Sequence, residues 1–226
     1  MEPLTLMRAS MIPAKDAVVS VMKGAVGAHV GLLYLADDSG TRRHLHLAFH
    51  YRLANDSPPP ADAFWVEPHL DELEIADVRA SARLIARRHQ DGRVPYALHS
   101  RGARFNESGG LELNKSRGLT CATFVLLVFE HANIILLDAA TWEQGRSADR
   151  TREDTDAQAR LVSLLREYPN GRAQAELIAS DVGCMRIRAE EVAAASGMPG
   201  RPISFAGAER QGHRVLKEIL TTPADL

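Results

Sequence analysis

Residues 118–129 read Gly-Leu-Thr-Cys-Ala-Thr-Phe-Val-Leu-Leu-Val-Phe, so that a cysteine, Cys121, lies where a short polar stretch runs into an apolar, helix-like segment. We predict a helix over residues 121–131 that begins at this cysteine. The N-terminus of a helix carries partial positive charge and free N–H groups, and both stabilise a thiolate. Because the thiolate is the nucleophilic form of cysteine, the position predicts a reactive Cys121 whose pKa is lowered.

A histidine-bearing β-hairpin is predicted upstream of this helix. His29 opens the apolar run 29–35, which is typical of a strand, and the Asp-Asp-Ser-Gly sequence at 37–40 is a strong turn signal. Polar and apolar residues then alternate over 44–53, which predicts one half-buried strand. The histidines on its polar face are His44, His46 and His50. The preceding apolar stretch, 17–26, ends among glycines and is predicted to be a short helix followed by a turn.

The rest of the chain is predicted to be mainly helical. Residues 99–118 are rich in Gly, Ser, Asn and charge, which indicates an ordered loop or a lid, and residues 134–137 indicate a short buried strand. The charged run 144–158 is interpreted as a solvated loop or helix start. Helices are predicted at 70–89, 161–165, 173–178, 189–195 and 209–220.

These elements predict an α+β fold. We expect a small antiparallel sheet of about four to six strands packed on the Cys121 helix. Residues 1–150 form the predicted core domain, and residues 151–226 form a helical C-terminal extension packed on it.

The order of the chemical groups resembles that of one protein family. A histidine at the start of a strand, a second histidine on the next strand and a cysteine at a helix start resemble the circularly permuted papain-like hydrolases. These include the permuted NlpC-type peptidases, the lecithin retinol acyltransferase-like enzymes and a permuted deubiquitinase-like group. The resemblance covers about residues 24–137, through the sequences His-Val-Gly-Leu-Leu-Tyr-Leu at 29–35 and Leu-Thr-Cys-Ala-Thr-Phe-Val at 119–125.

The resemblance implies a cysteine hydrolase that works through a thioester. Cys121 is then the nucleophile, and His29 accepts the thiol proton and later donates it to the leaving group. His46 is the first choice for the group that orients the His29 ring, and His44 is the alternative, because the turn between the two histidine strands is long. The backbone N–H of Cys121 is a candidate oxyanion donor, and a second donor is not identified.

We expect an amide substrate: a peptide, an isopeptide or a cell-wall cross-link. Two alternatives stay open, namely an acyltransferase or esterase on the same fold, and a non-catalytic binding module that uses the helical C-terminal region as its partner surface. A signal-less secreted effector with the same hydrolase chemistry is a further biological setting.

Structural roles compete with the catalytic ones. His50 is interpreted as solvent-facing, and Cys184 as structural. The histidines at 44, 46 and 50, with Asp37 or Asp38, are an alternative zinc site, but neither a His-Glu-x-x-His sequence nor a cysteine pair accompanies them. We therefore predict no metal and no cofactor.

Composition narrows the class of protein. The chain has 226 residues, 45% of them hydrophobic, which suffices for one substantial core. A net charge of −2 and 5% aromatic residues argue against nucleic-acid binding. Two cysteines do not make a disulfide scaffold. Neither a signal-peptide pattern nor an apolar run of ~18 residues is present, so we predict a cytoplasmic protein without an integral membrane segment. The oligomeric state is not predicted.

Overall fold

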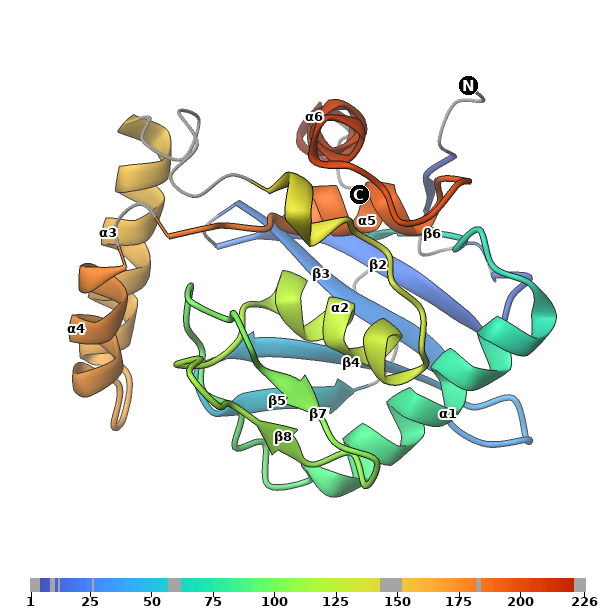
Figure 1. The fold of residues 1–226 in the computed structure, drawn as a ribbon, viewed down its shortest axis with the longest axis horizontal. Coiled ribbons are helices and arrows are strands. Elements are labelled where there is room, and N and C mark those ends of the chain that lie inside the picture. The colour runs from blue at the N-terminus through green and yellow to red at the C-terminus, as the bar shows by residue number, and fades with distance from the viewer. Residues whose placement is uncertain are drawn as a thin grey trace.

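The computed structural model describes residues 5–8, 11, 13–25, 27–56, 62–142, 152–181 and 184–221. The fold is α+β, as predicted, with a six-stranded antiparallel sheet in the order β1-β6-β2-β3-β4-β5. Helices α1 (Glu72–Arg88) and α2 (Cys121–His131) lie across one face of this sheet, whereas α3 (Arg152–Glu167) and α4 (Arg172–Ser180) stand to one side of it (Figure 1). The strands of the sheet are β1 (Met7–Arg8), β2 (Ala17–Gly24), β3 (Gly27–Leu35), β4 (Arg42–Phe49), β5 (Arg52–Asp56) and β6 (Phe64–Val66).

The prediction of a helix over 17–26 is wrong, because this stretch forms the interior strand β2. It pairs with β3 on one side and with β6 on the other. Both faces of β2 are covered: Val19 packs in the main core, and Val18 packs on the opposite face with Leu33 and Trp65. A strand buried on both faces loses the polar–apolar alternation, so its sequence does not distinguish it from a short helix.

The histidine hairpin is present, with one correction. Strands β3 and β4 are antiparallel, and Asp37 organises the turn between them by accepting hydrogen bonds from the backbone N–H groups of Ser39 and Thr41. The single strand predicted over 44–53 is instead two strands, because β4 ends at Phe49. The chain reverses at Tyr51, whose φ is 53°, and continues as β5.

Strands β3 and β4 separate toward the N-terminal end of β3. Their paired residues run from Leu35 and Arg42 to Leu32 and Leu45. Beyond Leu32 and Leu45, β4 stays paired with β5, while β3 stays paired with β2. A gap therefore opens between the first residues of β3 and the last residues of β4.

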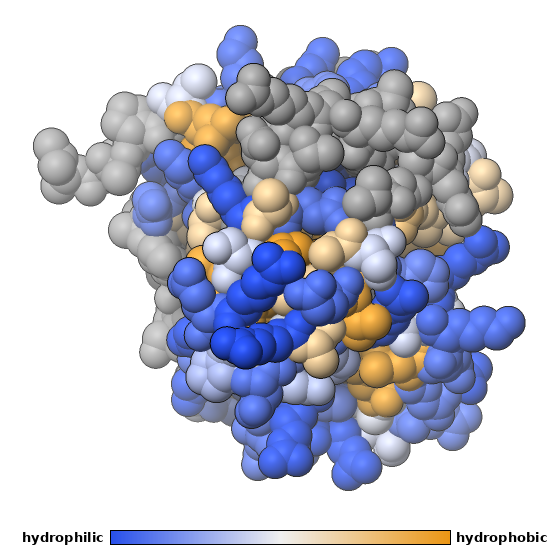
Figure 2. Space-filling view, turned by 90° about the vertical axis from the view of Figure 1, so that its left-hand side faces the viewer, coloured by the Kyte–Doolittle hydropathy of each residue, from blue (hydrophilic) through white to orange (hydrophobic). Residues whose placement is uncertain are grey.

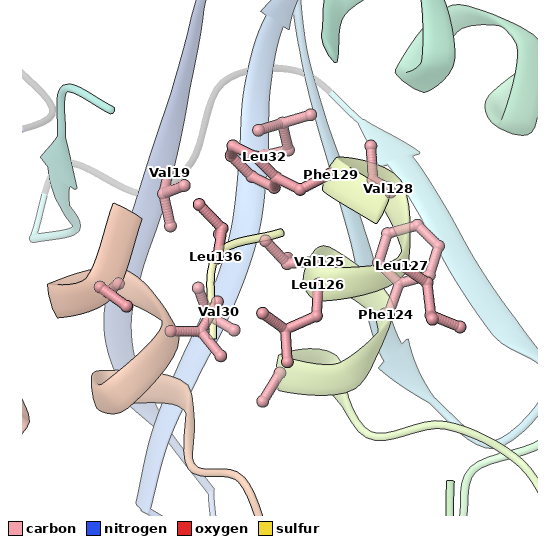
Figure 3. Packing of buried hydrophobic residues seen from close by; sticks show 14 of the residues in the cluster. Val19, Val30, Leu32, Phe124, Val125, Leu126, Leu127, Val128, Phe129 and Leu136 are labelled. Atoms are coloured by element: carbon pink, nitrogen blue, oxygen red, sulfur yellow. The ribbon is translucent and has the colours of Figure 1, made fainter. Parts of the chain in front are cut away.

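Helix α2 (Cys121–His131) fills the centre of the core and has the bounds predicted for it. Its residues from Cys121 to Phe129 are all buried, so a helix that is apolar on every side can form only inside the protein. Figure 3 shows side chains of α2 packed beside Val30 and Leu32 of β3. Helix α1 (Glu72–Arg88), also predicted, packs against the same helix.

The segment 99–118 contains a small hairpin, β7 (Arg104–Phe105) with β8 (Leu111–Glu112), that sequence patterns did not indicate. The strand predicted at 134–137 is not formed: Leu137 makes only an isolated bridge to Ile203. A short 3₁₀ helix, η1 (Ala139–Thr141), follows.

The C-terminal helices were predicted, and they divide into two groups. Helices α5 (Ala189–Ser196) and α6 (Phe205–Thr221) pack in the main core with the sheet. Helices α3 (Arg152–Glu167) and α4 (Arg172–Ser180) form a hairpin with a small hydrophobic cluster of its own. The division of the chain at residue 150 stays a prediction, and most of the charged run 144–158 lies outside the described residues.

No helix within the described ranges is both long enough and apolar enough to cross a membrane.

Candidate cysteine site

Cys121 lies at the first position of α2 and is 6% exposed. The preceding residue, Thr120, caps the helix: its side chain accepts a hydrogen bond from the N–H of Thr123, and the Thr123 hydroxyl accepts one from the N–H of Thr120. The Cys121 thiol receives hydrogen bonds from the backbone N–H groups of Val30 and Ala122 and from the Tyr96 hydroxyl. The cysteine therefore sits between the helix N-terminus and the opening edge of β3.

Tyr96 is a site residue that the sequence did not indicate. It is held beside Cys121 by a parallel bridge to Leu119, two residues before the cysteine. Its own N–H donates to Nδ1 of His50 at 3.2 Å. Gly118, with a φ of 152°, permits this close approach, because a Cβ at that position would collide with the carbonyl of Pro95. The Tyr96 hydroxyl also accepts a hydrogen bond from the N–H of Cys121.

Two of the predicted histidines are directly hydrogen bonded. Nε2 of His29 and Nδ1 of His46 are 2.8 Å apart, and Nε2 of His46 lies 3.7 Å from a carboxylate oxygen of Asp56. The alternative third residue, His44, instead bonds the Ser20 hydroxyl at 2.7 Å and stacks on the His46 ring. The geometry thus connects His29 to His46 and, through His46, to Asp56, whereas His44 lies outside this series of contacts.

The Asp56 carboxylate gives a basis for assigning the protons of the two rings, which the atomic positions themselves do not show. An ionised carboxylate only accepts hydrogen bonds, so we assign the proton of His46 to Nε2, facing Asp56. Nδ1 of His46 is then an acceptor, and Nε2 of His29 is its donor. In the described part of the chain, Nδ1 of His29 makes no hydrogen bond and holds a free lone pair.

The structure places His29 next to Cys121 in space but does not hydrogen bond the two. Side chains alternate along β3, so Val30 and Leu32 face α2, while His29 and Gly31 face the other side together with His44 and His46. The thiol nevertheless reaches the N–H of Val30. Because that nitrogen is bonded to the carbonyl carbon of His29, the thiol lies within one peptide unit of the histidine.

Burial controls the protonation of both groups. Desolvation raises the pKa of the Cys121 thiol, and the Val30, Ala122 and Tyr96 hydrogen bonds only partly oppose it. The prediction of a lowered pKa at Cys121 is therefore wrong, because desolvation outweighs the helix N-terminus. Burial, and secondarily the charge of His46, lower the pKa of His29 to about 4. At neutral pH the site holds a thiol and a neutral imidazole.

A cavity of about 710 Å³ joins these groups. It extends from the β2–β3 turn, through the gap between β3 and β4, to the side of α3. Both Cys121 and His29 line it, together with Tyr96. Cys121 and His29 therefore border the same cavity, although their side chains lie on opposite faces of β3.

The remaining predicted residues have structural surroundings. His50 is 1% exposed, so its interpretation as solvent-facing is wrong: it is buried and positions the backbone of Tyr96. Cys184 is partly buried and packs against the α3–α4 cluster. Within the described ranges, no group of three His, Cys, Asp or Glu side chains is arranged to hold a metal ion.

Tyr96 and Asp56 were missed, and His50 was wrongly interpreted as solvent-facing, for one reason: each takes its place through pairing or packing between separate segments of the chain. The Val-Pro-Tyr sequence at 94–96 gives no signal that its tyrosine lies beside residue 121.

Comparisons with protein-family models, with curated proteins and with solved structures find no match for this chain. The class of protein therefore has to be inferred from the site itself.

Proposed function

We propose that the protein is a cysteine hydrolase of the circularly permuted papain-like type, which cleaves an amide bond through a thioester on Cys121. One observation carries the proposal: the thiol at the N-terminus of α2 contacts the backbone beside His29, and both residues line one cavity. The hydrogen bond from His29 to His46 supports it further, because a base oriented by a second polar group is the arrangement that nucleophilic catalysis requires.

The first chemical step is attack of Cys121 on the substrate carbonyl. The His29 ring faces away from α2 in the structure, so it has to turn toward the thiol at the gap between β3 and β4 before its Nδ1 takes the thiol proton as the sulfur–carbon bond forms. Until it turns, its Nε2–H donates to His46, which lies 3.7 Å from Asp56. His29 then donates the proton to the leaving amine, and water hydrolyses the thioester.

Two donors beside the thiol suit the developing oxyanion. The N–H of Cys121 and the O–H of Tyr96 converge there: at present the Cys121 N–H donates to the Tyr96 oxygen, and the Tyr96 O–H donates to the thiol. A substrate carbonyl oxygen would take these hydrogen bonds over as negative charge develops on it. Tyr96 is thus the proposed second oxyanion donor.

The reaction has a characteristic pH dependence. The active pair is a neutral thiol with a neutral imidazole, and the pKa of His29 is lowered to about 4. We therefore expect kcat/KM to stay level as the pH falls from 7 toward 5 and to drop only as His29 becomes protonated near pH 4. A drop centred near 6.5 would contradict this assignment.

The experiment that tests the proposal combines turnover with iodoacetamide labelling followed by peptide mass spectrometry. Peptide-library cleavage by the wild type is compared with Cys121→Ala and His29→Gln, each expected to lower turnover by on the order of 10³-fold or more. His29→Gln should also slow the labelling of Cys121, while Cys184 in the same chain serves as the control and keeps its rate. An unchanged labelling rate of Cys121 in His29→Gln would contradict the assignment of His29 as the general base.

A non-catalytic binding module is the second candidate, and the raised pKa of the buried thiol favours it. This candidate predicts no cleavage by the wild type and no dependence of Cys121 labelling on His29.

A further inference from the structure

A second cavity, of about 620 Å³, lies apart from the one beside Cys121. Its walls are the C-terminal half of α1 on one side and strands β3, β4 and β5 on the other (Figure 1). The two cavities share no lining residue. A volume of this order is typical of small-molecule sites. The ligand of this second cavity is therefore a question separate from the proposed hydrolase.

The sheet side of the second cavity centres on Tyr34 of β3. Arg43 of β4 pairs with Tyr34 across the two strands, so the two side chains lie on the same face of the sheet. Asn55 of β5 accepts a hydrogen bond from the Tyr34 hydroxyl at 3.1 Å. Among the described residues, neither the NH2 group of Asn55 nor the guanidinium of Arg43 has a hydrogen-bond partner. These donors are free to bind a ligand.

The helix side of the cavity supplies two more guanidinium groups. Arg83 bonds the Leu35 carbonyl and lies 3.4 Å from a carboxylate oxygen of Asp38, so its charge is partly matched. Arg87 follows one turn later on α1 and is exposed. Its Nε bonds the Arg83 carbonyl, and its two terminal nitrogens have no partner in the part of the chain that the structure describes.

The acidic residues of this cavity are already engaged. Asp37 accepts the hydrogen bonds of the β3–β4 turn, and Asp38 lies close to two arginines of α1. Burial raises the pKa of the Tyr34 hydroxyl, and the charges that most oppose this rise are those of Arg43, Arg83 and Arg87. Residues 57–61, which follow β5, lie outside the described residues, and their sequence contains no Asp or Glu. An anion beside the Tyr34 hydroxyl therefore has three positive charges around it.

The cavity also has an apolar wall, formed by Leu45, Leu53 and Ala86. A ligand whose charged group lies at Tyr34 can place an organic group against this wall. The side of the molecule that bears α3 and α4 is different: Figure 2 shows it mostly hydrophilic where it is coloured, with small separate hydrophobic spots. The coloured part of that side offers no broad apolar face to a protein or a lipid.

We propose that the second cavity binds a phosphate monoester, with its phosphate at the Tyr34 hydroxyl, within reach of Arg43 and Arg87, and its organic group on the apolar wall. Each guanidinium can donate two parallel hydrogen bonds, and the Tyr34 O–H and the Asn55 NH2 add further donors. Together they exceed the roughly four hydrogen bonds that one carboxylate accepts. A phosphate offers three acceptor oxygens and a charge near −2, and matches this set better.

Calorimetric titration with three small anions tests the two halves of the site. Phenyl phosphate should bind at least about tenfold more tightly than benzoate, which has the same ring but carries a carboxylate. It should exceed inorganic phosphate by a similar factor, because inorganic phosphate lacks the ring. Equal affinity for phenyl phosphate and benzoate, or binding of neither, would overturn the proposal.

Two variants locate the binding. Arg87→Gln and Arg43→Gln should each weaken the binding of phenyl phosphate about tenfold. Both side chains are exposed, so the variants should keep the fold. Arg88→Gln is the matched control and should stay within about twofold of the wild type, because Arg88 is exposed on the same helix and does not line the cavity. Equal losses in Arg87→Gln and Arg88→Gln would overturn the site in favour of a general effect of charge.

The same phosphate group can come from a free small molecule or from a phosphotyrosine side chain of another protein. Phenyl phosphate is therefore compared with a short peptide whose central residue is phosphotyrosine. Peptide binding that is about tenfold tighter supports the site and assigns its ligand to a protein. Equal or weaker peptide binding supports the site and assigns its ligand to a small molecule.

Discussion

Helices α2 and α3 line the same cavity, yet they are held in the molecule in different ways. Helix α2 is capped by Thr120 and buried from Cys121 to Phe129 inside the main core. Helix α3 buries only one face, in a small cluster of Leu98, Leu161, Val162, Leu165, Ala175 and Ile178. Cys121, the proposed nucleophile, thus stands on a helix buried in the main core, whereas Arg160, which also lines the cavity, stands on a helix that packs in a smaller apolar cluster.

The α3–α4 hairpin is joined to the core by a few specific contacts. Gln174 donates a hydrogen bond to the carbonyl of Tyr96 at 2.6 Å, and Arg117 pairs with Asp181 at 2.9 Å. The Tyr168 ring makes an edge contact with Phe49. Because the free energy of local opening follows the buried contacts that opening breaks, we expect the hairpin to open more readily than the sheet and α2. The following predictions test this difference.

The largest effect is expected at Phe124 in α2. This side chain is fully buried and makes an edge contact with Phe105. Phe124→Ala should lower the free energy of global unfolding by about 3–5 kcal/mol, because a cavity is left in a close-packed core. Urea denaturation measures the change. Leu73→Ala, at a site 78% exposed, is the control and should stay within about 0.5 kcal/mol of the wild type. A loss below about 1.5 kcal/mol at Phe124 would contradict the rigid core.

The second prediction concerns pH: acid should lower the stability of the sheet that bears His29 and His44. Burial lowers the pKa of His29 to about 4 and that of His44 to about 3, whereas unfolded histidine titrates near 6.5. Below pH 6.5 the unfolded chain therefore binds more protons than the folded one, so stability is lost as the pH falls from 6.5 toward those values. The titration of His29 alone should lower the free energy of unfolding by roughly 2 kcal/mol between pH 7 and pH 4.5. Urea denaturation at pH 7, 5.5 and 4.5 tests this, and His29→Gln should flatten the slope.

In contrast to the sheet, the attachment of the α3–α4 hairpin to the core should become more stable as the pH falls. Burial raises the pKa of Asp181, with Arg117 only partly opposing it, so the folded state holds this proton more tightly than the unfolded state. The contribution of Asp181 to the free energy of unfolding therefore becomes more favourable to the folded state as the pH falls through that raised pKa. Hydrogen exchange, resolved by peptide, separates the hairpin from the sheet in the same samples.

Leu165→Ala should affect the hairpin more than the rest of the molecule. Leu165 is fully buried in the α3–α4 cluster. Leu165→Ala should lower the free energy of opening of the hairpin by about 2–3 kcal/mol. Protection of backbone amides from hydrogen exchange should therefore fall across α3 and α4 and stay unchanged in the sheet. Uniform loss of protection in every element would show that the hairpin and core unfold as one unit.

The smallest expected effect belongs to Gln174. Gln174→Ala removes the hydrogen bond to Tyr96 and should cost about 1 kcal/mol. Gln158→Ala is the matched control, since Gln158 bonds the Ile178 carbonyl within the hairpin at 2.7 Å. If the hydrogen bond from Gln174 to Tyr96 holds Tyr96 in place beside Cys121, Gln174→Ala should change the iodoacetamide labelling rate of Cys121 and Gln158→Ala should not. Equal labelling rates in the two variants would contradict this positioning role of Gln174.

Local patterns predicted the elements that bear Cys121 and His29. The bounds of α2 followed from an apolar run after a polar stretch, and β3 followed from the run that begins at His29. The same reasoning failed for β2, where both faces are buried and the periodicity disappears. It also failed for the pKa of Cys121, because the depth of burial is not a local property.

The sequence by itself determined the α+β class, the helix that begins at Cys121 and the histidines on the neighbouring strands, because each of these depends on residues close together in the chain. Only the tertiary structure decided that His46 rather than His44 bonds His29, since this depends on the register of β3 against β4 and on Ser20 of β2. It likewise brought Tyr96 and Arg160 to the cavity beside Cys121, and Asp56 to His46, from three separate segments. Pairing between distant segments and desolvation are collective effects of packing, and no short stretch of sequence encodes them.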